Sequence, residues 1–293
     1  MNANLQPASE SPEPSLLSGV NVLLEGLTGT GKTTALATIA EAVPELFIVF
    51  TEPGLESFIG YWTDKGKKVP ENVHWHVMEQ EKGNFSLLAE NAKIIRTYTI
   101  ESLFKMQDPQ RSRHDEYEKF LRTFIDFPDD RTGRKFGPVD SWGPNRCIAI
   151  DSLTGINHTA FSLIIGNKPL KDQRDWGMAQ DLIEKFVRQL TGGCECHFVL
   201  TAHVERELDQ VFGGVKVTVS TLGKALAPKI PPMFSDVVLA YREAKNFYWS
   251  TANPQADLKT RNLPLADGIE PSFRQIFDKW QSRGGRFTQD VKK

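Results

Sequence analysis

Short runs of consecutive apolar residues recur along this chain, and polar segments rich in glycine, proline and charged residues separate them. Leu46–Phe50 and Cys147–Ile150 show no polar alternation, which indicates strands buried on both faces. Strands of this kind are typical of a parallel sheet that is covered by helices. The pattern therefore predicts an α/β fold with a mainly parallel sheet sandwiched by helices.

Strands and helices alternate along most of the chain in this interpretation. Helices are predicted at 31–43 and 176–191. The predicted strands are 20–25, 46–51, 72–78, 146–150 and 197–202, followed by strands near 215–219, 235–241 and 246–250.

The same pattern divides the chain into one large domain and two polar ends. Residues 1–18 are rich in Ser, Pro, Glu and Asn and are expected to form a flexible arm, and residues 281–293 a polar tail. The domain is expected to span 19–280. Within it, the segment from about 104 to 145 interrupts the alternation and is interpreted as a surface insertion with one amphipathic stretch, Tyr117–Phe127.

A complete phosphate-binding motif, G-x-x-x-x-G-K-T, lies between the first predicted strand and the first predicted helix. Its glycines allow a tight turn in which successive backbone N–H groups face one anion, and the following helix adds its N-terminal dipole. Lys32 is expected to reach the β- and γ-phosphates, and the Thr33 hydroxyl to bind Mg²⁺. The predicted nucleotide-binding residues are Gly26, Thr28, Gly29, Thr30, Gly31, Lys32, Thr33 and Thr34. The sequence therefore predicts an ATPase or a GTPase.

Three polar residues at the ends of other predicted strands complete the candidate site. Asp151 is expected to hold Mg²⁺ beside Thr33. We interpret Glu52 as the base that orients the attacking water. His203 is the candidate sensor of the γ-phosphate, and the alternative is a buried core histidine. Because the carboxyl ends of parallel strands meet at one edge of a sheet, these side chains are expected to lie together.

The composition adds constraints on partners and location. The chain has 293 residues and a formal net charge of −2, so any contact with DNA has to come from local basic loops. Three cysteines, no apolar leader near Met1 and no apolar run approaching ~18 residues predict a soluble cytoplasmic protein without a membrane partner. Cys194, Cys196 and His197 lie close together in the sequence, but a closed zinc site needs four ligands and no second Cys/His cluster is present.

Four segments of the chain together resemble the core of RecA-type ATPases. They are Gly26–Thr34, Phe50–Glu52, Ile148–Leu153 and Val199–His203. The resemblance spans about residues 19 to 265 and is closest to the short, core-only RecA-like nucleotide-binding proteins of bacteriophages, some of which act in single-strand annealing. In that superfamily the acid after the second core strand is the catalytic glutamate, which matches Glu52 here. The position of His203 more often carries Gln, so this residue departs from the pattern.

The resemblance implies a function and partners. It implies a Mg²⁺-dependent ATPase that forms a homo-oligomeric ring or filament with ATP between subunits. It further implies binding of single-stranded DNA in phage recombination or annealing inside a bacterial host, with a single-stranded-DNA-binding protein as a further candidate partner. Two alternatives stay open: a ring-forming DNA helicase or helicase-like motor, and an assembly factor that ATP switches without DNA.

RecA-type recombinases hold DNA with two loops, which correspond here to about 155–175 and about 205–229. The candidate DNA-binding residues are Lys168, Lys171, Arg174, Arg206, Lys216, Lys224 and Lys229. Flexible basic loops would neutralise phosphates without reading bases. Acidic residues in the same segments leave a second interpretation open, in which the loops form a lid or a subunit contact without DNA.

Lys259 and Arg261 resemble the K-x-R element by which ring-forming RecA-type ATPases insert two cations into the site of the neighbouring subunit. On an extended strand the two side chains point to the same face, so both could reach one γ-phosphate. An arginine finger supplied across an interface makes hydrolysis depend on assembly. The alternative is that the two like charges protect an exposed strand edge against aggregation.

Overall fold

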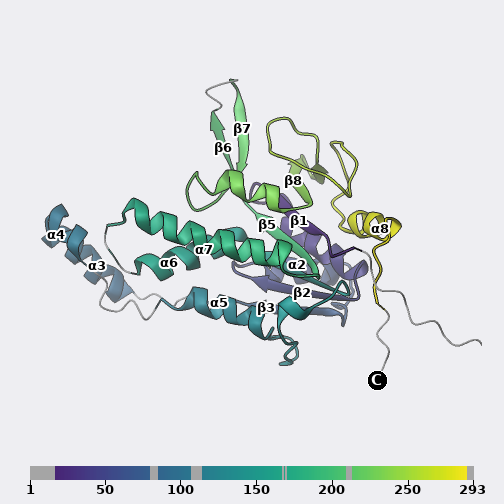
Figure 1. Ribbon diagram of the computed structural model, residues 1–293, viewed down its shortest axis with the longest axis horizontal. Helices are drawn as coiled ribbons and strands as arrows, with labels where there is room; N and C mark the ends of the chain where they lie inside the picture. Colours follow the sequence, from purple (N-terminus) through teal and green to yellow (C-terminus); the bar gives the residue numbers. More distant parts are fainter. Residues whose placement is uncertain are drawn as a thin grey trace, which may run out of the picture.

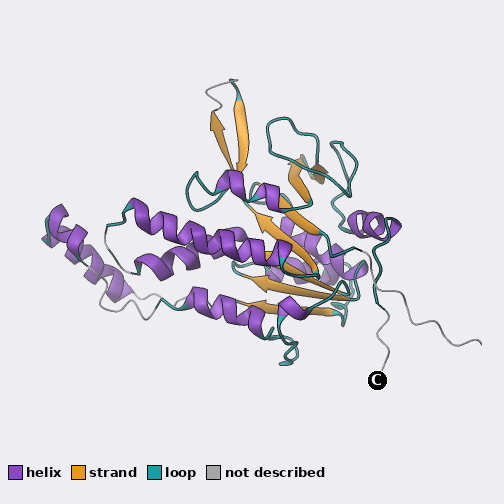
Figure 2. Cartoon of the chain, in the orientation of Figure 1, coloured by secondary structure: helices purple, strands orange, loops and turns teal. Residues whose placement is uncertain are grey.

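The computed structural model describes residues 17–79, 85–106, 114–166, 168, 170–208 and 213–288 of the chain. Its centre is a seven-stranded sheet with the order β3-β2-β4-β5-β1-β8-β9 (Figure 1; Figure 2). Strands from β3 to β8 in this order pair in parallel, and β9 is antiparallel to β8. The strands are β1 (Asn21–Gly26), β2 (Glu45–Phe50), β3 (Val73–Val77), β4 (Arg146–Asp151), β5 (His197–Ala202), β8 (Asp236–Glu243) and β9 (Asn246–Ser250).

Helices cover both faces of this sheet, which confirms the predicted fold class. One face packs against α1 (Lys32–Leu36), the 3₁₀ helix η1 (Ala37–Glu41), α2 (Leu55–Thr63) and α8 (Arg274–Ser282). The opposite face packs against α5 (Glu116–Ile125), α6 (Leu153–Ile165) and α7 (Gln173–Gly192), which lie side by side in Figure 1. The alternation of strand side chains divides the core accordingly: Val22 and Leu24 pack on the first face, and Leu23 packs on the second.

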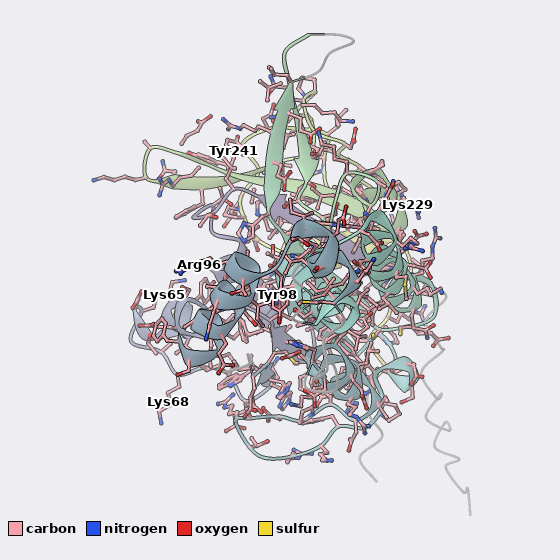
Figure 3. All side chains as sticks on the ribbon, turned by 90° about the vertical axis from the view of Figure 1, so that its left-hand side faces the viewer. Lys65, Lys68, Arg96, Tyr98, Lys229 and Tyr241 are labelled. Atoms are coloured by element: carbon pink, nitrogen blue, oxygen red, sulfur yellow. The ribbon has the colours of Figure 1, made fainter. Side chains whose placement is uncertain are left out.

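Two parts of the chain extend away from this body. Helices α3 (Phe85–Thr97) and α4 (Ile100–Lys105) form an arm on the left of Figure 1, and Arg96 and Tyr98 mark it in Figure 3. Strands β6 (Val204–Leu208) and β7 (Val215–Val219) form a separate antiparallel hairpin directly after β5. The strand predicted near 215–219 therefore exists, but it is not part of the main sheet. Short 3₁₀ turns are η3 (Val139–Ser141), η4 (Ala227–Lys229) and η5 (Pro231–Met233).

Most of the loop expected at about 155–175 is helical, which corrects that prediction. The end of α6 and the start of α7 leave only residues 166–172 as a connection. The helix forms because Leu153, Ile156 and Ala160 are buried at helical spacing against the sheet. That burial outweighs the low helix propensity of Gly155 and its polar neighbours.

Other helices also differ from the sequence prediction. The helix predicted at 31–43 is α-helical only to Leu36 and continues as η1, and α7 is slightly longer than the predicted 176–191. The sequence pattern did not predict α2, α3, α4 or α8. Within the described ranges, no helix has the length and apolar character needed to cross a membrane.

The segment from 104 to 145 contributes to the core, so it is more than a surface insertion. Tyr117 and Phe120 of α5, together with Phe127 and Trp142, are buried on the α6–α7 face of the sheet. The amphipathic stretch expected at Tyr117–Phe127 is thus a core helix that widens this layer. Residues 107–113 of the segment lie outside the described residues.

The two ends of the described chain lie against each other. Trp280 Nε1 donates a hydrogen bond to the Ser18 carbonyl oxygen at 2.9 Å, and the ring centroids of Trp280 and Phe287 lie 5.2 Å apart. The expected polar tail is therefore packed as far as Phe287. Residues 1–16 of the expected arm, and residues 289–293 of the tail, lie outside the described residues.

Candidate nucleotide-binding site

The phosphate loop connects β1 to α1 at the carboxyl edge of the sheet. Gly29 and Gly31 have φ angles of 74° and 81°, which are left-handed values that favour glycine. The Thr30 hydroxyl donates to the Leu27 carbonyl oxygen at 2.8 Å and closes the turn. The loop therefore has the tight turn that the motif predicts.

Lys32 is the first residue of α1, and its side chain is buried. Its ammonium group donates to the carbonyl oxygens of Gly26 and Leu27 at 2.8 and 2.9 Å. Burial lowers the pKa of Lys32 to about 8, while the negative charges of Asp151 and Glu52 oppose this shift. A buried ammonium group of this kind is stabilised when an anion such as a phosphate binds beside it.

Asp151 is the last residue of β4 and lies next to the phosphate loop. Its Oδ2 accepts a hydrogen bond from Thr33 Oγ1 at 2.6 Å, and its Oδ1 accepts one from Thr201 Oγ1. Thr201 is a buried residue of β5, the strand that separates β4 from β1. Sequence reasoning missed Thr201, although its place two residues before His203 on a buried strand is a signal that could have identified it.

Glu52 and His203 lie together, as the sequence predicts. The distance from His203 Nε2 to Glu52 Oε2 is 3.9 Å, and the same carboxylate oxygen accepts a hydrogen bond from Ser152 Oγ. Burial, and then the charge of Lys32, lower the pKa of His203, whereas Glu52 and Asp151 oppose the change. Burial therefore favours the uncharged form of the His203 ring.

A second network fixes the start of α6 against the end of β2. Thr51 Oγ1 donates to the Ser152 carbonyl oxygen and accepts from the Ser152 N–H, both at 2.8 Å. Ser152 Oγ in turn accepts from the Thr154 N–H at 3.2 Å and so caps α6. Glycine is required at position 155, because a Cβ there would lie 2.3 Å from Thr51 Oγ1. These contacts hold the backbone directly before Glu52 and were not predicted.

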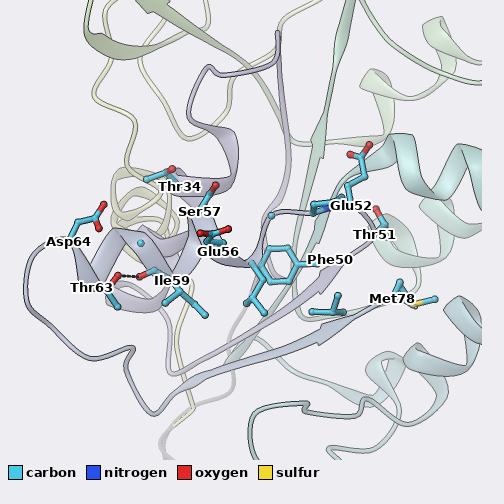
Figure 4. Close-up of a pocket in the computed structure, with 15 residues that line it drawn as sticks. Thr34, Phe50, Thr51, Glu52, Glu56, Ser57, Ile59, Thr63, Asp64 and Met78 are labelled. Atoms are coloured by element: carbon cyan, nitrogen blue, oxygen red, sulfur yellow. Dashed lines mark hydrogen bonds between the residues drawn. The ribbon is translucent and has the colours of Figure 1, made fainter. Parts of the chain in front are cut away.

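Cavities flank the phosphate loop on two sides. The larger, of about 1140 Å³, lies between the end of β2 and α2 and is drawn in Figure 4. Its lining includes Thr34, Glu52, Glu56, Ile59 and Met78. The second, of about 600 Å³, lies between loop residues 27–30, β8 and the β6–β7 hairpin. Because Thr34 follows the phosphate motif and opens into the larger cavity, that cavity is the candidate site for the nucleoside.

Lys259 and Arg261 do not share the extended strand that the sequence predicts. Lys259 forms a bridge opposite Val237, and the chain then bends at 261–263. The Lys259 ammonium group donates to the Phe234 carbonyl oxygen at 2.7 Å. The Arg261 side chain is exposed and forms no ion pair with any described residue, so it alone is available to a neighbouring subunit.

Most of the candidate DNA-binding cations pair with acids of their own chain. The N–O distances are 2.8 Å for Lys168–Asp175, 3.4 Å for Arg174–Asp172, 2.9 Å for Lys216–Asp257, 3.0 Å for Lys224–Glu207 and 2.8 Å for Lys229–Glu184. The Lys171 ammonium group lies 4.8 Å from the centroid of the Phe161 ring. Arg206, on the hairpin, forms no ion pair with the residues that the structure describes, so it is the candidate least committed to intramolecular contacts.

Oxygen ligands suited to Mg²⁺ are present beside the phosphate loop. Thr33 Oγ1 and Asp151 Oδ2 lie 2.6 Å apart, and a Mg²⁺ ion in a nucleotide site uses one or two protein oxygens together with phosphates and water. In the described part of the chain, no three or more His, Cys, Asp or Glu side chains are arranged to hold a metal by themselves. The pair therefore fits a Mg²⁺ ion that arrives with a nucleotide.

No protein-family model and no curated protein matches the chain. One similar solved structure is an ATPase from the type III secretion system of pathogenic bacteria, with 12% identity, a TM-score of 0.35, and coverage of 77% of this chain and 53% of that chain. Another is the assembled ATPase EscN of enteropathogenic E. coli, in complex with its central stalk EscO, with 11% identity, a TM-score of 0.40, and coverage of 90% and 59% respectively. This chain thus spans little more than half the length of those proteins. Its own sheet order and phosphate loop define it as an α/β protein with a P-loop nucleotide-binding fold.

Proposed function

We propose that this protein is a Mg²⁺-dependent ATPase of the RecA-like P-loop class. One observation carries the proposal: Lys32 and Thr33 at the start of α1, Asp151 at the end of β4 and Glu52 after β2 meet at one edge of the sheet. A nucleotide site of this kind needs a cation for the phosphates, oxygen ligands for Mg²⁺ and a carboxylate for the attacking water.

In this proposal each side chain acts on one part of the reaction. The backbone N–H groups of the loop and the Lys32 ammonium group bind the β- and γ-phosphates. Thr33 and Asp151 hold Mg²⁺, which neutralises the charge that develops on the phosphates. Glu52 orients the attacking water and accepts its proton. His203, whose Nε2 lies 3.9 Å from Glu52 Oε2, would respond when the γ-phosphate leaves.

Measurement of ATP hydrolysis by the purified protein tests this proposal. Turnover should require Mg²⁺ and should fall at least ~100-fold in Glu52→Gln, which keeps the size of the side chain but cannot accept the proton. The matched control is Glu101→Gln, an exposed position on the α3–α4 arm, which should hydrolyse ATP at the normal rate. Normal turnover in Glu52→Gln would remove Glu52 from the catalytic role.

We further propose that the active form is a homo-oligomer with the nucleotide between subunits. Arg261 is the candidate finger, because its side chain is exposed and forms no ion pair with the described residues. Mixing Arg261→Ala with Lys32→Ala protein tests this: complementing sites should restore part of the activity that each variant lacks. If the ATPase activity of the wild-type protein stays proportional to its concentration on dilution, the proposed dependence on a homo-oligomer is contradicted.

Binding of single-stranded DNA is the second candidate function, in phage recombination or annealing or in a helicase-like motor. The β6–β7 hairpin favours it, because the hairpin projects from the sheet directly after His203 and carries Arg206 (Figure 1). Arg206→Gln should weaken DNA binding. The slope of log affinity against log salt concentration should fall by the amount expected for about one phosphate contact. Lys279→Gln, on α8, is the matched control. ATP turnover that does not respond to DNA, with no DNA binding at low salt, would favour an assembly factor that ATP switches.

A further inference from the structure

A third cavity, of about 510 Å³, lies between the β6–β7 hairpin, the start of α7 and the segment 221–231. It is separate from the residues assigned above to phosphates, Mg²⁺ and the attacking water. One buried acid, Glu25 of β1, contributes to its lining. The chemistry of this acid and its surroundings indicates what the cavity binds.

Glu25 is a buried carboxyl group between apolar strand neighbours. It is 2% exposed, and its strand neighbours in the register are Ala202 and Leu239. It forms no hydrogen bond or ion pair with the residues that the structure describes. Burial, and then the charge of Asp257, raise the pKa of Glu25 to about 8. The shift favours the protonated acid at neutral pH. Among the described residues that line this cavity, Glu25 is the one charged or acidic side chain that is almost fully buried.

The other charged groups that face the cavity leave an excess of acid. Asp257, Glu205 and Glu207 line it together with Lys216 and Lys224. The two lysines are already paired, Lys216 with Asp257 at 2.9 Å and Lys224 with Glu207 at 3.0 Å. Glu205 accepts a hydrogen bond from a serine hydroxyl at 2.6 Å and has no cationic partner in the described residues. With Glu25, the cavity thus holds two carboxyl groups that lack a cation.

Most of the remaining lining is apolar, which makes a hydrated metal ion a poor occupant. Trp176, Val219 and Pro231 face the cavity, and the Trp176 ring packs 4.5 Å from that of Phe161, measured between centroids. An indole ring beside carboxylates favours an organic cation, through cation–π attraction and contact with alkyl carbons. Over the described ranges, no acidic cluster is arranged to hold a metal ion.

We propose that this cavity is a binding site for an organic cation, an alkylammonium or guanidinium group, that pairs with Glu25. The cation comes either from a free polyamine or from a Lys or Arg side chain of a second copy of this chain. Binding converts the Glu25 carboxylic acid to a carboxylate, and the proton passes to solvent. The affinity for the cation therefore rises with pH up to about pH 8 and then levels off.

Calorimetric titration with spermidine at pH 6.5, 7.5 and 8.5, at constant ionic strength, tests the free-ligand source. We expect one site whose affinity increases by up to about tenfold per pH unit below pH 8. Glu25→Gln, which resembles the neutral acid and should fold normally, should bind at least ~10-fold more weakly and lose the pH dependence. Glu101→Gln should bind like the wild type. Hexaamminecobalt(III), which has the same charge without alkyl carbons, should not compete.

Sedimentation of the same proteins over the same pH range tests the second source. If spermidine does not bind, but Glu25→Gln weakens a self-association that strengthens with pH in the wild type, the cation is a side chain of another copy. If neither spermidine binding nor self-association distinguishes Glu25→Gln from Glu101→Gln, the proposal is overturned. Neither readout requires ATP hydrolysis, so a failure here is distinct from a failure of the proposed ATPase function.

Discussion

Replacing Thr201 with valine tests whether Asp151, the proposed Mg²⁺ ligand, has to be held by β5. The Thr201 hydroxyl donates to Asp151 Oδ1, while Thr33 occupies Oδ2 of the same carboxylate. Valine keeps the shape of threonine and removes the donor, so it leaves a buried carboxylate oxygen without its partner. A hydrogen bond to a charged group contributes about 1.5–3 kcal/mol. Mutation of a residue that orients a metal ligand typically lowers metal affinity by about 10- to 100-fold.

The assay is the binding of a fluorescent ATP analogue as a function of Mg²⁺ concentration. In Thr201→Val, the Mg²⁺ concentration that gives half-maximal binding should rise by about 10- to 100-fold. Thr201→Ser is the matched control, because it retains the hydroxyl group and loses only a methyl group. It should stay within about threefold of the wild type. Circular dichroism at the assay temperature establishes that both variants are folded.

Two results would refute this reasoning. If Thr201→Val binds Mg²⁺ and nucleotide like the wild type, the contact with Asp151 does not matter for the metal. If Thr201→Ser is impaired as strongly as Thr201→Val, the methyl group and packing of β5 matter rather than the hydroxyl group.

Other predictions concern stability and its dependence on pH. Asp236 is buried and accepts hydrogen bonds from the backbone N–H groups of Arg261 and Asn262, both at 2.8 Å. Asp236→Ala leaves both donors without an acceptor and should lower the free energy of unfolding in urea by about 2–6 kcal/mol. A loss below about 1 kcal/mol would contradict this network. Burial lowers the pKa of His197 to about 3 in the folded state. In the unfolded state the same histidine binds a proton as the pH falls below about 6.5, whereas in the folded state it does not. Stability should therefore fall by about 1.4 kcal/mol per pH unit as the pH decreases from 6.5 toward 5, and His197→Gln should show a smaller slope in the same urea titrations.

The sequence predicted the strands of the sheet well because each is buried on both faces. An uninterrupted apolar run such as Leu46–Phe50 carries that information within a few residues. The phosphate loop was also predictable, because its motif is contiguous in the sequence. By contrast, α2 begins directly after Pro53 and Gly54, two residues that usually mark a turn, and α6 contains glycine and polar residues in its first two turns. Their helical state depends on burial against the sheet, which local propensity does not contain.

Electrostatic pairing was the least predictable property of the candidate site. Lys216 is separated from Asp257 by 41 positions in the chain and Lys229 from Glu184 by 45, and the sequence gives no sign that these groups meet. A lysine in a glycine-containing loop therefore has the same appearance in the sequence whether it is free for DNA or neutralised by a distant acid. Only the fold distinguishes Arg206 from the paired cations around it.

The register between β2 and β4 explains why Thr51 and Ser152 were missed although both neighbour predicted site residues. Phe50 pairs with Asp151, so the next residue of each strand, Thr51 and Ser152, meet at the edge and form their reciprocal hydrogen bonds. A shift of one residue would turn each of these side chains to the opposite face and would separate Glu52 from Ser152. Register is fixed by the packing of whole strands, so the position of the candidate base depends on apolar residues several positions away. The motif indicates the chemistry of the site, whereas the packing of the sheet determines the geometry of the site.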